Sequence, residues 1–448
     1  MNTDILQNLT DEEREMVKIL SQVVDIVGEI FAKEQNNPDF RGANFYPHDI
    51  TREEFDQAAI RDPELSRFDT IVERTSASVY RAVPYSVKYQ KYYKRIIPLL
   101  QKAKDLCEDS SFRVYLSSLI LCLEEGSLAA YRQMMVAWMN TKNYEINFPF
   151  TYDERYMDDL LGLKGSYNAA VFVEDEKLTA GIQKPLSIQD GFVDTLSLPG
   201  TPVVYPRLSA AVYRTVNHKG MMADMNLRAW NVPDDSEARL EAGSRQIMIR
   251  KTIMDLFKNE LKPMADVLFA PDNEGFSEDE LQAGIFWAVT LHEMCHNVAH
   301  YQRQKGQEKY AVILEELKSY VLPIPWLFSC KQENICSPAE VKAGLLGNYS
   351  LSLSGLAMAE KIKTRESYAQ ATLVHFNYLQ DHGAIEITGR EIKTNFDKIV
   401  SVNLDLFHEI VQIIERGNYD RARKFVETYN KRDRFHDILK ELRKVVHV

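Results

Sequence analysis

The run Leu291-His-Glu-Met-Cys-His296 carries the clearest chemical signal in the chain, because it places two imidazoles four residues apart. Side chains four residues apart share one face of a helix, so His292 and His296 can reach a single metal ion. Glu293 points to the neighbouring face, from which it can hydrogen-bond a water at the metal without binding the metal itself. The run therefore predicts a metal centre suited to hydrolysis, with Glu293 as the general base.

A third ligand is expected from a second helical pattern, which runs from Glu308 to Tyr320 after a break at Gly306. This segment can return antiparallel to the first helix and offer a carboxylate. We predict Glu316 as the ligand because it follows His296 by 20 positions, a spacing also found in some two-helix zinc peptidases. In the alternative interpretation the histidines are ordinary core or surface residues and Glu316 belongs to a solvated face. The coincidence of helix, spacing and carboxylate favours the metal site.

The helices that must carry these residues are indicated by capping boxes, in which a Ser or Thr hydroxyl accepts from a free N–H and a Glu three positions later reaches back. The box at Ser277 begins the helix expected to carry both histidines. Four such pairs occur: Thr10 with Glu13, Thr51 with Glu54, Ser277 with Glu280, and Ser337 with Glu340.

Strand signals lie mainly between residues 145 and 225, where Ala169–Val173 and Thr201–Tyr205 are apolar runs beside turn residues. From about residue 240 to the end, helical periodicity returns, for example at Leu404, Phe407 and Val411. We predict an α+β protein, mostly helical, in two lobes. Residues 1–260 form mainly the lower lobe, with a helical N-terminal part and the β-rich stretch 145–225, and residues 261–448 form the helical metal-binding lobe.

Composition narrows the class of protein further. The chain has 448 residues, with 45% hydrophobic and 27% charged, as expected for a folded soluble protein. Its net charge of -11 has the wrong sign for attraction to nucleic-acid phosphates. Five scattered cysteines suit free thiols, and no apolar run approaches the roughly 20 residues that span a bilayer. The first residues lack a secretory signal. We therefore expect a cytoplasmic protein without nucleic-acid or membrane partners.

With these motifs, the chain resembles the dipeptidyl peptidase III zinc peptidases over most of its length. The best-known members of that family insert one extra residue between the two histidines, whereas this chain keeps the helix-matched spacing. The segments that carry the resemblance are Asn44–Glu54, Asp159–Tyr167, Asn226–Gly243 with its Asn231-Val-Pro-Asp234 core, the histidine run, and Glu315-Glu-Leu-Lys-Ser319.

The resemblance implies two lobes around a wide cleft, with zinc on the helical lobe held by His292, His296 and Glu316. It also implies that Asn231 and Asp234 bind the free amino end of a small peptide substrate, although both can equally be ordinary cleft or loop residues. Asp234 replaces a family asparagine, and its negative charge still suits an ammonium group. Tyr152 falls where the family has a tyrosine near the scissile bond.

Two departures from the family concern substrate and transition state. Phe150 stands at the substrate-binding position of a family glutamate, and it can neither carry charge nor accept a hydrogen bond. Where the family has Ala-His-x-Gln-Ala-Arg, this chain reads Ser367-Tyr-Ala-Gln-Ala-Thr372. Tyr368 can still donate to a developing oxyanion, but Thr372 brings no positive charge.

Three functions remain open from the sequence. The favoured one is a zinc-dependent peptidase on small peptides. Two histidines and one carboxylate also describe sites that hold Fe²⁺ for oxygen chemistry, so the same fold can serve a different reaction on a small molecule. The departures at Phe150, Tyr368 and Thr372 motivate the third, a catalytically weak metal-containing protein that binds peptides.

Overall fold

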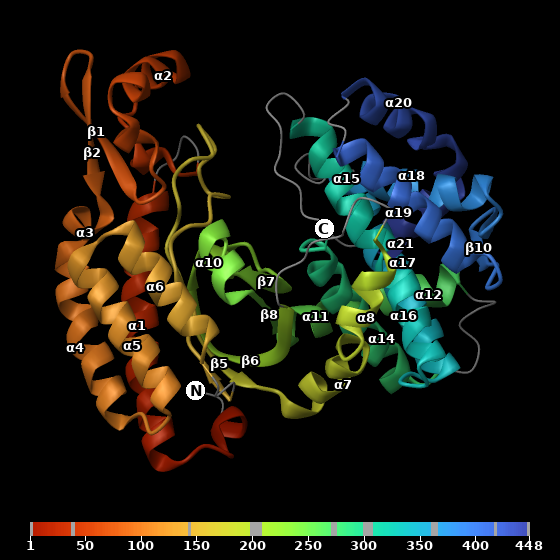
Figure 1. Ribbon diagram of the computed structural model, residues 1–448, viewed down its shortest axis with the longest axis horizontal. Helices are drawn as coiled ribbons and strands as arrows, with labels where there is room; N and C mark the ends of the chain where they lie inside the picture. The colour runs from red at the N-terminus through yellow and green to blue at the C-terminus, as the bar shows by residue number, and fades with distance from the viewer. Residues whose placement is uncertain are drawn as a thin grey trace. The chain divides into compact units, whose positions relative to one another are not determined.

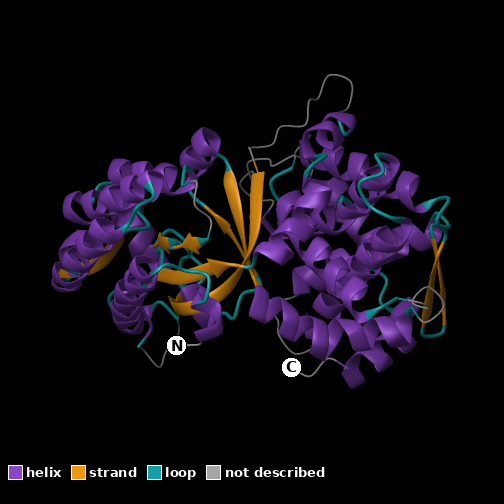
Figure 2. Cartoon of the chain, turned by 90° about the horizontal axis from the view of Figure 1, so that it is seen from below, coloured by secondary structure: helices purple, strands orange, loops and turns teal. Residues whose placement is uncertain are grey.

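The chain folds into two compact units, seen in a computed structural model that describes residues 3–36, 41–141, 145–197, 208–269, 276–298, 308–359, 366–415 and 419–445. The first unit comprises residues 1–176 and 211–250, and the second comprises residues 177–210 and 251–448. Figure 1 traces the chain by colour from red to blue. Helices predominate in the chain as a whole, with strands gathered mainly in the first unit (Figure 2), so the predicted α+β, mostly helical class is confirmed.

Helices of the first unit pack side by side at the start of the chain, with α1 against α4 and α5 between α4 and α6 (Figure 1). The capping boxes at Thr10 and Thr51 begin α1 and α2 as predicted. The bounds are α1 (Asp11–Gln35), α2 (Arg52–Arg61), α3 (Tyr85–Lys88), α4 (Gln90–Leu106), α5 (Ser110–Glu125), α6 (Leu128–Met139), α9 (Met221–Asp224) and α10 (Ser236–Ala242), with short 3-10 turns at Thr3–Leu6, Ala43–Phe45 and Pro63–Ser66.

A six-stranded sheet forms the rest of the first unit. Its order is β3-β5-β6-β8-β7, with β4 also paired to β5. The central pair β5 and β6 is antiparallel, with Asn168 opposite Gly220 and Glu174 opposite Tyr213. The bounds are β3 (Ile146–Asn147), β4 (Phe150–Thr151), β5 (Asn168–Glu174), β6 (Leu208–Gly220), β7 (Ala229–Val232) and β8 (Ser244–Ile249), and a separate hairpin joins β1 (Thr70–Ser76) to β2 (Val79–Pro84).

The prediction that strands lie mainly between residues 145 and 225 was correct for β5, but the sheet extends beyond that range. Ala169–Val173 lies within β5, while the expected strand at 201–205 falls outside the described residues. The prediction that helices resume at 240 was wrong for β8, and it missed the hairpin of β9 and β10. Short strands such as β7 carry too few residues for a clear period of two, and their pairing partners decide their structure.

The second unit is built around two buried helices, α14 and α17, which pack closely together. Most α17 residues between Val341 and Ala357 are buried, so this helix is enclosed around its circumference, including polar residues such as Asn348 and Ser352. The capping boxes at Ser277 and Ser337 precede them as predicted. The bounds are α7 (Glu176–Leu186), α8 (Gln189–Thr195), α11 (Arg250–Leu256), a π-helix (Phe257–Leu261), α12 (Lys262–Leu268), α14 (Glu278–Cys295), α15 (Glu308–Val321), α16 (Pro323–Gln332), α17 (Pro338–Ala359), α18 (Glu366–Asp381), β9 (Ile385–Thr388), β10 (Glu391–Thr394), α19 (Ile399–Glu415), α20 (Tyr419–Tyr429), a 3-10 turn (Asp433–Phe435) and α21 (His436–Val445).

The division between the units differs from the expected boundary at 260, because residues 177–210 belong with the second unit. The reason is the packing of α7 and α8 on the helices of that unit. The Trp326 indole donates to Pro185 O at 2.7 Å, and its ring lies 4.9 Å from the ring of Phe192. The Trp287 indole donates to Gly181 O at 3.0 Å. These buried contacts are between residues distant in sequence, so they leave no local signal.

Among the described residues, no helix is long and apolar enough to cross a membrane. All five cysteines are buried as free thiols, as their scatter through the sequence suggested.

Candidate metal centre

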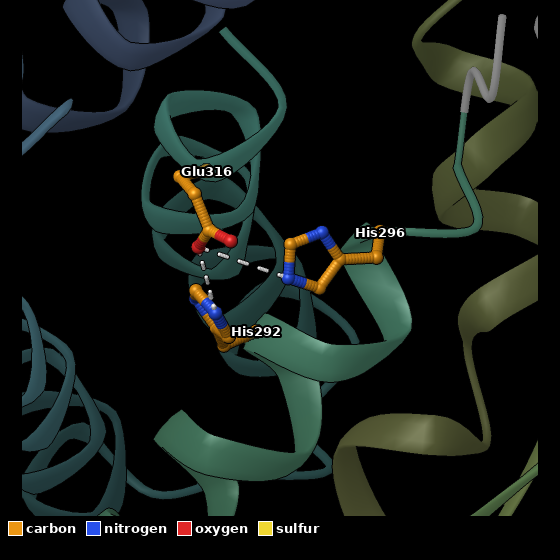
Figure 3. A group of neighbouring side chains, drawn as sticks. All are labelled: His292, His296 and Glu316. Carbon is orange, nitrogen blue, oxygen red and sulfur yellow. Dashed lines mark ion pairs between the residues drawn. The ribbon is translucent and has the colours of Figure 1, made fainter. Parts of the chain in front are cut away.

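Helices α14 and α15 bring the three predicted ligands together (Figure 3). His292 lies in the last turn of α14, His296 directly follows its final residue, and Glu316 lies in α15. Glu316 Oε2 is 3.6 Å from His292 Nε2 and 3.9 Å from His296 Nε2. One ligand atom from each residue lies within 4.8 Å of the other two. The rings of the two histidines meet edge to face, with centroids 4.9 Å apart.

The three residues fit a divalent cation. Glu316 Oε2 is buried without a hydrogen-bond partner among the described residues, although it faces two imidazole nitrogens. A buried carboxylate oxygen left unpaired is costly, and a cation held between it and two imidazoles would remove that cost. Two nitrogen ligands and one oxygen ligand are a donor set typical of a catalytic zinc site.

The pKa values of the ligands show how burial and charge compete. Burial raises the pKa of Glu316 to about 7 and lowers the pKa of His292 well below its usual value. Burial also acts to lower the pKa of His296, but the carboxylates of Glu316 and Glu315 outweigh it and raise that pKa to about 9. The carboxylates of Glu315 and Glu316 therefore favour a positive charge at His296.

A group of α15 residues supports His296 from the side away from Glu316. Ser319 Oγ is 3.0 Å from His296 Nδ1, and Glu315 Oε1 is 3.4 Å from the same nitrogen. Lys318 pairs with Glu315 at 2.8 Å and is completely buried. Burial acts to raise the pKa of Glu315, but Lys318 and His296 overcome it and hold that pKa at about 2. Sequence reasoning assigned only Glu316 in this run and missed these residues, although their spacing of three and four from Glu315 was a readable signal.

Glu293 and Tyr368 both lie beside the ligands. Glu293 directly follows His292 on α14, and its negative charge raises the pKa values of His296 and Glu316. Tyr368, on α18, hydrogen-bonds the Glu316 carboxylate. Thr372 is buried one turn further along α18, where its hydroxyl donates to Ser352 O and Tyr368 O, each at 2.9 Å.

Phe150 and Tyr152 lie in the core of the first unit. Phe150, in β4, is fully buried and meets the Tyr167 ring edge to face. Tyr152 is 5% exposed, its hydroxyl is 3.4 Å from Cys122 Sγ, and its ring lies 4.5 Å from that of Tyr131. These contacts give both rings a packing role, and the structure shows almost no exposed surface on either ring.

Asn231 and Asp234 also belong to the first unit, on and just after β7. Asn231 Oδ1 accepts a hydrogen bond from the Ser244 hydroxyl. The Asp234 carboxylate is 48% exposed and lies 3.6 Å from Arg239.

Two acidic residues near Asp234, Asp153 and Glu154, were missed by sequence reasoning. Both are buried, and burial together with the Asp234 charge raises the pKa of Asp153 to about 7 and that of Glu154 well above its usual value. They directly follow Tyr152 in the sequence, but nothing in their local pattern indicates that they approach Asp234.

Comparison with solved structures identifies the fold. The structure of DPP III from Caldithrix abyssi matches with a TM-score of 0.82 and 22% identity, covering 98% of this chain and 94% of that one. Dipeptidyl-peptidase III from Corallococcus sp. strain EGB matches with a TM-score of 0.77 and 18% identity, covering 98% and 92%. The chain therefore has a dipeptidyl peptidase III-like fold, which confirms the resemblance found in the sequence.

Sequence comparison gives one further relative. Nudix hydrolase 3 from Arabidopsis thaliana is 24% identical over 435 residues, covering 87% of this chain and 54% of that protein. The chain thus spans about half the length of this relative. No model of a known protein family matches the chain.

Proposed function

We propose that this protein is a zinc-dependent hydrolase, and specifically a peptidase that acts on small peptides. The observation that carries the proposal is the unpaired, buried Glu316 Oε2 facing the Nε2 atoms of His292 and His296. The dipeptidyl peptidase III-like fold supports the peptidase assignment, because both similar structures bear that name. This chain covers about half of the Nudix relative, so the name of that protein carries no activity over to it.

Two side chains beside the ligands have the chemistry that peptide hydrolysis needs. A zinc ion bound by His292, His296 and Glu316 supplies a Lewis acid that polarises a carbonyl and acidifies water. Glu293 takes a proton from the attacking water and passes it to the leaving amine. Tyr368 donates its phenol hydrogen to the oxygen on which negative charge develops.

Recognition of the peptide is the part in which this chain departs from the family. We keep Asn231 and Asp234 as proposed contacts for the free amino end, because the half-exposed Asp234 carboxylate suits an ammonium group. We do not assign Phe150 and Tyr152 to substrate, since both are buried in the core of the first unit.

An iron site is the second candidate, since two histidines and one carboxylate also hold Fe²⁺ in oxygenases. The charge of Glu293 beside His296 and Glu316 favours zinc and hydrolysis, because hydrolysis needs a base at that position. Elemental analysis of protein purified without air separates the two readings. Stoichiometric zinc together with peptide turnover excludes the hypothesis of an iron site.

The test of the proposal is a panel of dipeptidyl-arylamide substrates with wild-type protein and Glu293→Gln. We expect turnover by the wild type and a loss of about 10²- to 10⁴-fold in Glu293→Gln, with bound zinc retained. Glu278→Gln, an exposed change at the other end of α14, is the matched control and should behave as wild type. Turnover unaffected by Glu293→Gln contradicts the mechanism. Tight peptide binding with no product from the wild type identifies a binding protein instead.

A further inference from the structure

We infer that Lys318 and Ser319 are positioning residues of the metal centre, which together hold His296 in place from α15. The inference rests on the proposed metal-binding function and names the residues on which the second imidazole depends.

His296 needs outside support because its own helix ends before it. The last residue of α14 is Cys295, and the chain continues in tight turns in which Asn297 N bonds Met294 O at 3.0 Å and Val298 N bonds Cys295 O at 3.3 Å. Such an end frays unless its free carbonyls find donors. A ligand placed there is not fixed by helix geometry alone.

Lys318 supplies those donors. Its ammonium group carries three hydrogens and has three acceptors: Val298 O at 2.6 Å, His296 O at 3.3 Å and Glu315 Oε1 at 2.8 Å. The side chain is completely buried, so these contacts replace its hydration. A cation at the C-terminal end of a helix also interacts favourably with the helix dipole. Lys318 thus fixes the main chain on both sides of Asn297 and holds Glu315 near the imidazole.

Ser319 fixes the ring itself. Its hydroxyl donates to Glu315 O at 3.1 Å, so at 3.0 Å from His296 Nδ1 it is an acceptor for an Nδ1 hydrogen. Glu315 Oε1, 3.4 Å from the same nitrogen, is also an acceptor. A hydrogen kept at Nδ1 leaves the lone pair of the neutral ring at Nε2, the atom that faces Glu316. Ser319 therefore selects both the ring orientation and the tautomer that can bind a metal.

His292 does not depend on the side chains of Lys318 and Ser319, because its contact with Ser319 is to the main chain of that residue, which Ser319→Ala leaves in place. It lies within α14, and its ring packs against that of Tyr320 with centroids 4.8 Å apart. Removing Lys318 or Ser319 therefore acts on one ligand of three, which predicts weakened metal binding in a protein that still folds.

The experiment measures zinc affinity by competition with a chromophoric chelator in wild type, Ser319→Ala and Lys318→Met. The matched control is Ser352→Ala, which removes an equally buried serine hydroxyl whose bond, to Tyr349 O at 3.0 Å, lies within α17. We expect both α15 variants to bind zinc about 10- to 100-fold more weakly, and the control to bind as wild type. The visible spectrum of the Co²⁺-substituted protein should change in the two variants and not in the control, because it reports ligand geometry.

Thermal unfolding of the metal-free proteins separates positioning from general destabilisation. Ser319→Ala and Ser352→Ala should lose similar amounts of stability without metal, so a lower zinc affinity in Ser319→Ala alone supports the inference. If Lys318→Met does not fold, Ser319→Ala decides. Wild-type affinity and an unchanged Co²⁺ spectrum in Ser319→Ala overturn the inference and leave the proposed metal site intact, whereas wild-type protein that binds no zinc overturns both.

Discussion

Glu316 is the residue whose surroundings say most about the chemistry of this protein. It is 7% exposed, its pKa is raised to about 7 by burial, and one of its oxygens faces two imidazoles without a hydrogen bond. Folding places a carboxylate in such a position only where something else stabilises it. In the proposed mechanism, Glu293 and Tyr368 supply the base and the hydrogen-bond donor.

Tyr368→Phe should lower kcat about 10²- to 10³-fold, because in the proposed mechanism the phenol hydrogen that Tyr368 gives to Glu316 in the resting site is donated to the developing negative charge in the transition state. Zinc should stay bound, since Tyr368 contacts the ligand Glu316 and is not itself a ligand. Steady-state kinetics with a dipeptidyl-arylamide check this, with Tyr378→Phe on the same helix as the control. Wild-type kcat in Tyr368→Phe would assign the oxyanion contact elsewhere.

The residues of the candidate metal site could be predicted from the sequence, because residues three or four positions apart lie on the same face of a helix. His292, His296 and Glu293 follow from one helical turn, and Glu316 from a second helix. The packing of Phe150 and Tyr152 could not be predicted, because it depends on tyrosines outside their local segment. Tyr131 and Tyr167 enclose them, and no local pattern shows that contact.

At the scale of elements, α14, the helix that carries His292, packs in close contact with α17. Gly284 on α14 lies against the main chain of α17, and a Cβ added to it would lie 2.4 Å from Ala343 O. Gly347 on α17 also lies against the main chain of α14, with its added Cβ 2.8 Å from Gly284 O. The two backbones can approach this closely only because both positions lack side chains.

Gly284→Ala should therefore destabilise the second unit by about 1–3 kcal/mol, since the added methyl group must push two helices apart. Gly181→Ala is the matched control: this glycine lies within α7 with nothing within 4 Å of the added Cβ, and it should gain about 0.5–1 kcal/mol from helix propensity. Urea unfolding of the two variants measures both effects. Equal stability of the two variants would mean that the helices separate without cost.

At the scale of the whole molecule, metal binding should act on one unit. Zinc at 100 times its dissociation constant should stabilise the second unit by about 2.7 kcal/mol, because all three ligands belong to it. Calorimetry should show that zinc raises the midpoint temperature of one thermal transition and that a chelator returns it to its original value. The same experiment on Glu316→Ala is the control, and a zinc-dependent shift in that variant would place the binding site elsewhere.

Acid should weaken the second unit through His375, which is fully buried with Nε2 2.8 Å from Asn403 Oδ1. Burial lowers its pKa to about 4, whereas the unfolded chain has a pKa of about 6.5. The unfolded state therefore binds a proton that the folded state refuses, and stability present above pH 6.5 falls as the pH drops toward 4. The slope is about 1.4 kcal/mol per pH unit.

Urea unfolding between pH 7 and pH 4 measures that slope, and His375→Gln should make it shallower because glutamine does not titrate. An unchanged slope in His375→Gln would show that other groups dominate. His218 should give the first unit a similar loss of stability in acid, since burial also lowers its pKa to about 4.

The sequence by itself determined the features that depend on neighbours a few residues away. Capping boxes began four helices at the stated residues, and helical spacing indicated the three residues that could hold a metal ion. Tertiary structure decided what depends on contacts between distant residues: the extent of the sheet, the assignment of residues 177–210 to the second unit, and the support of His296 by Lys318 and Ser319. The physical reason is that side-chain periodicity is a local property of the backbone, whereas burial and hydrogen-bond partners are properties of the folded chain.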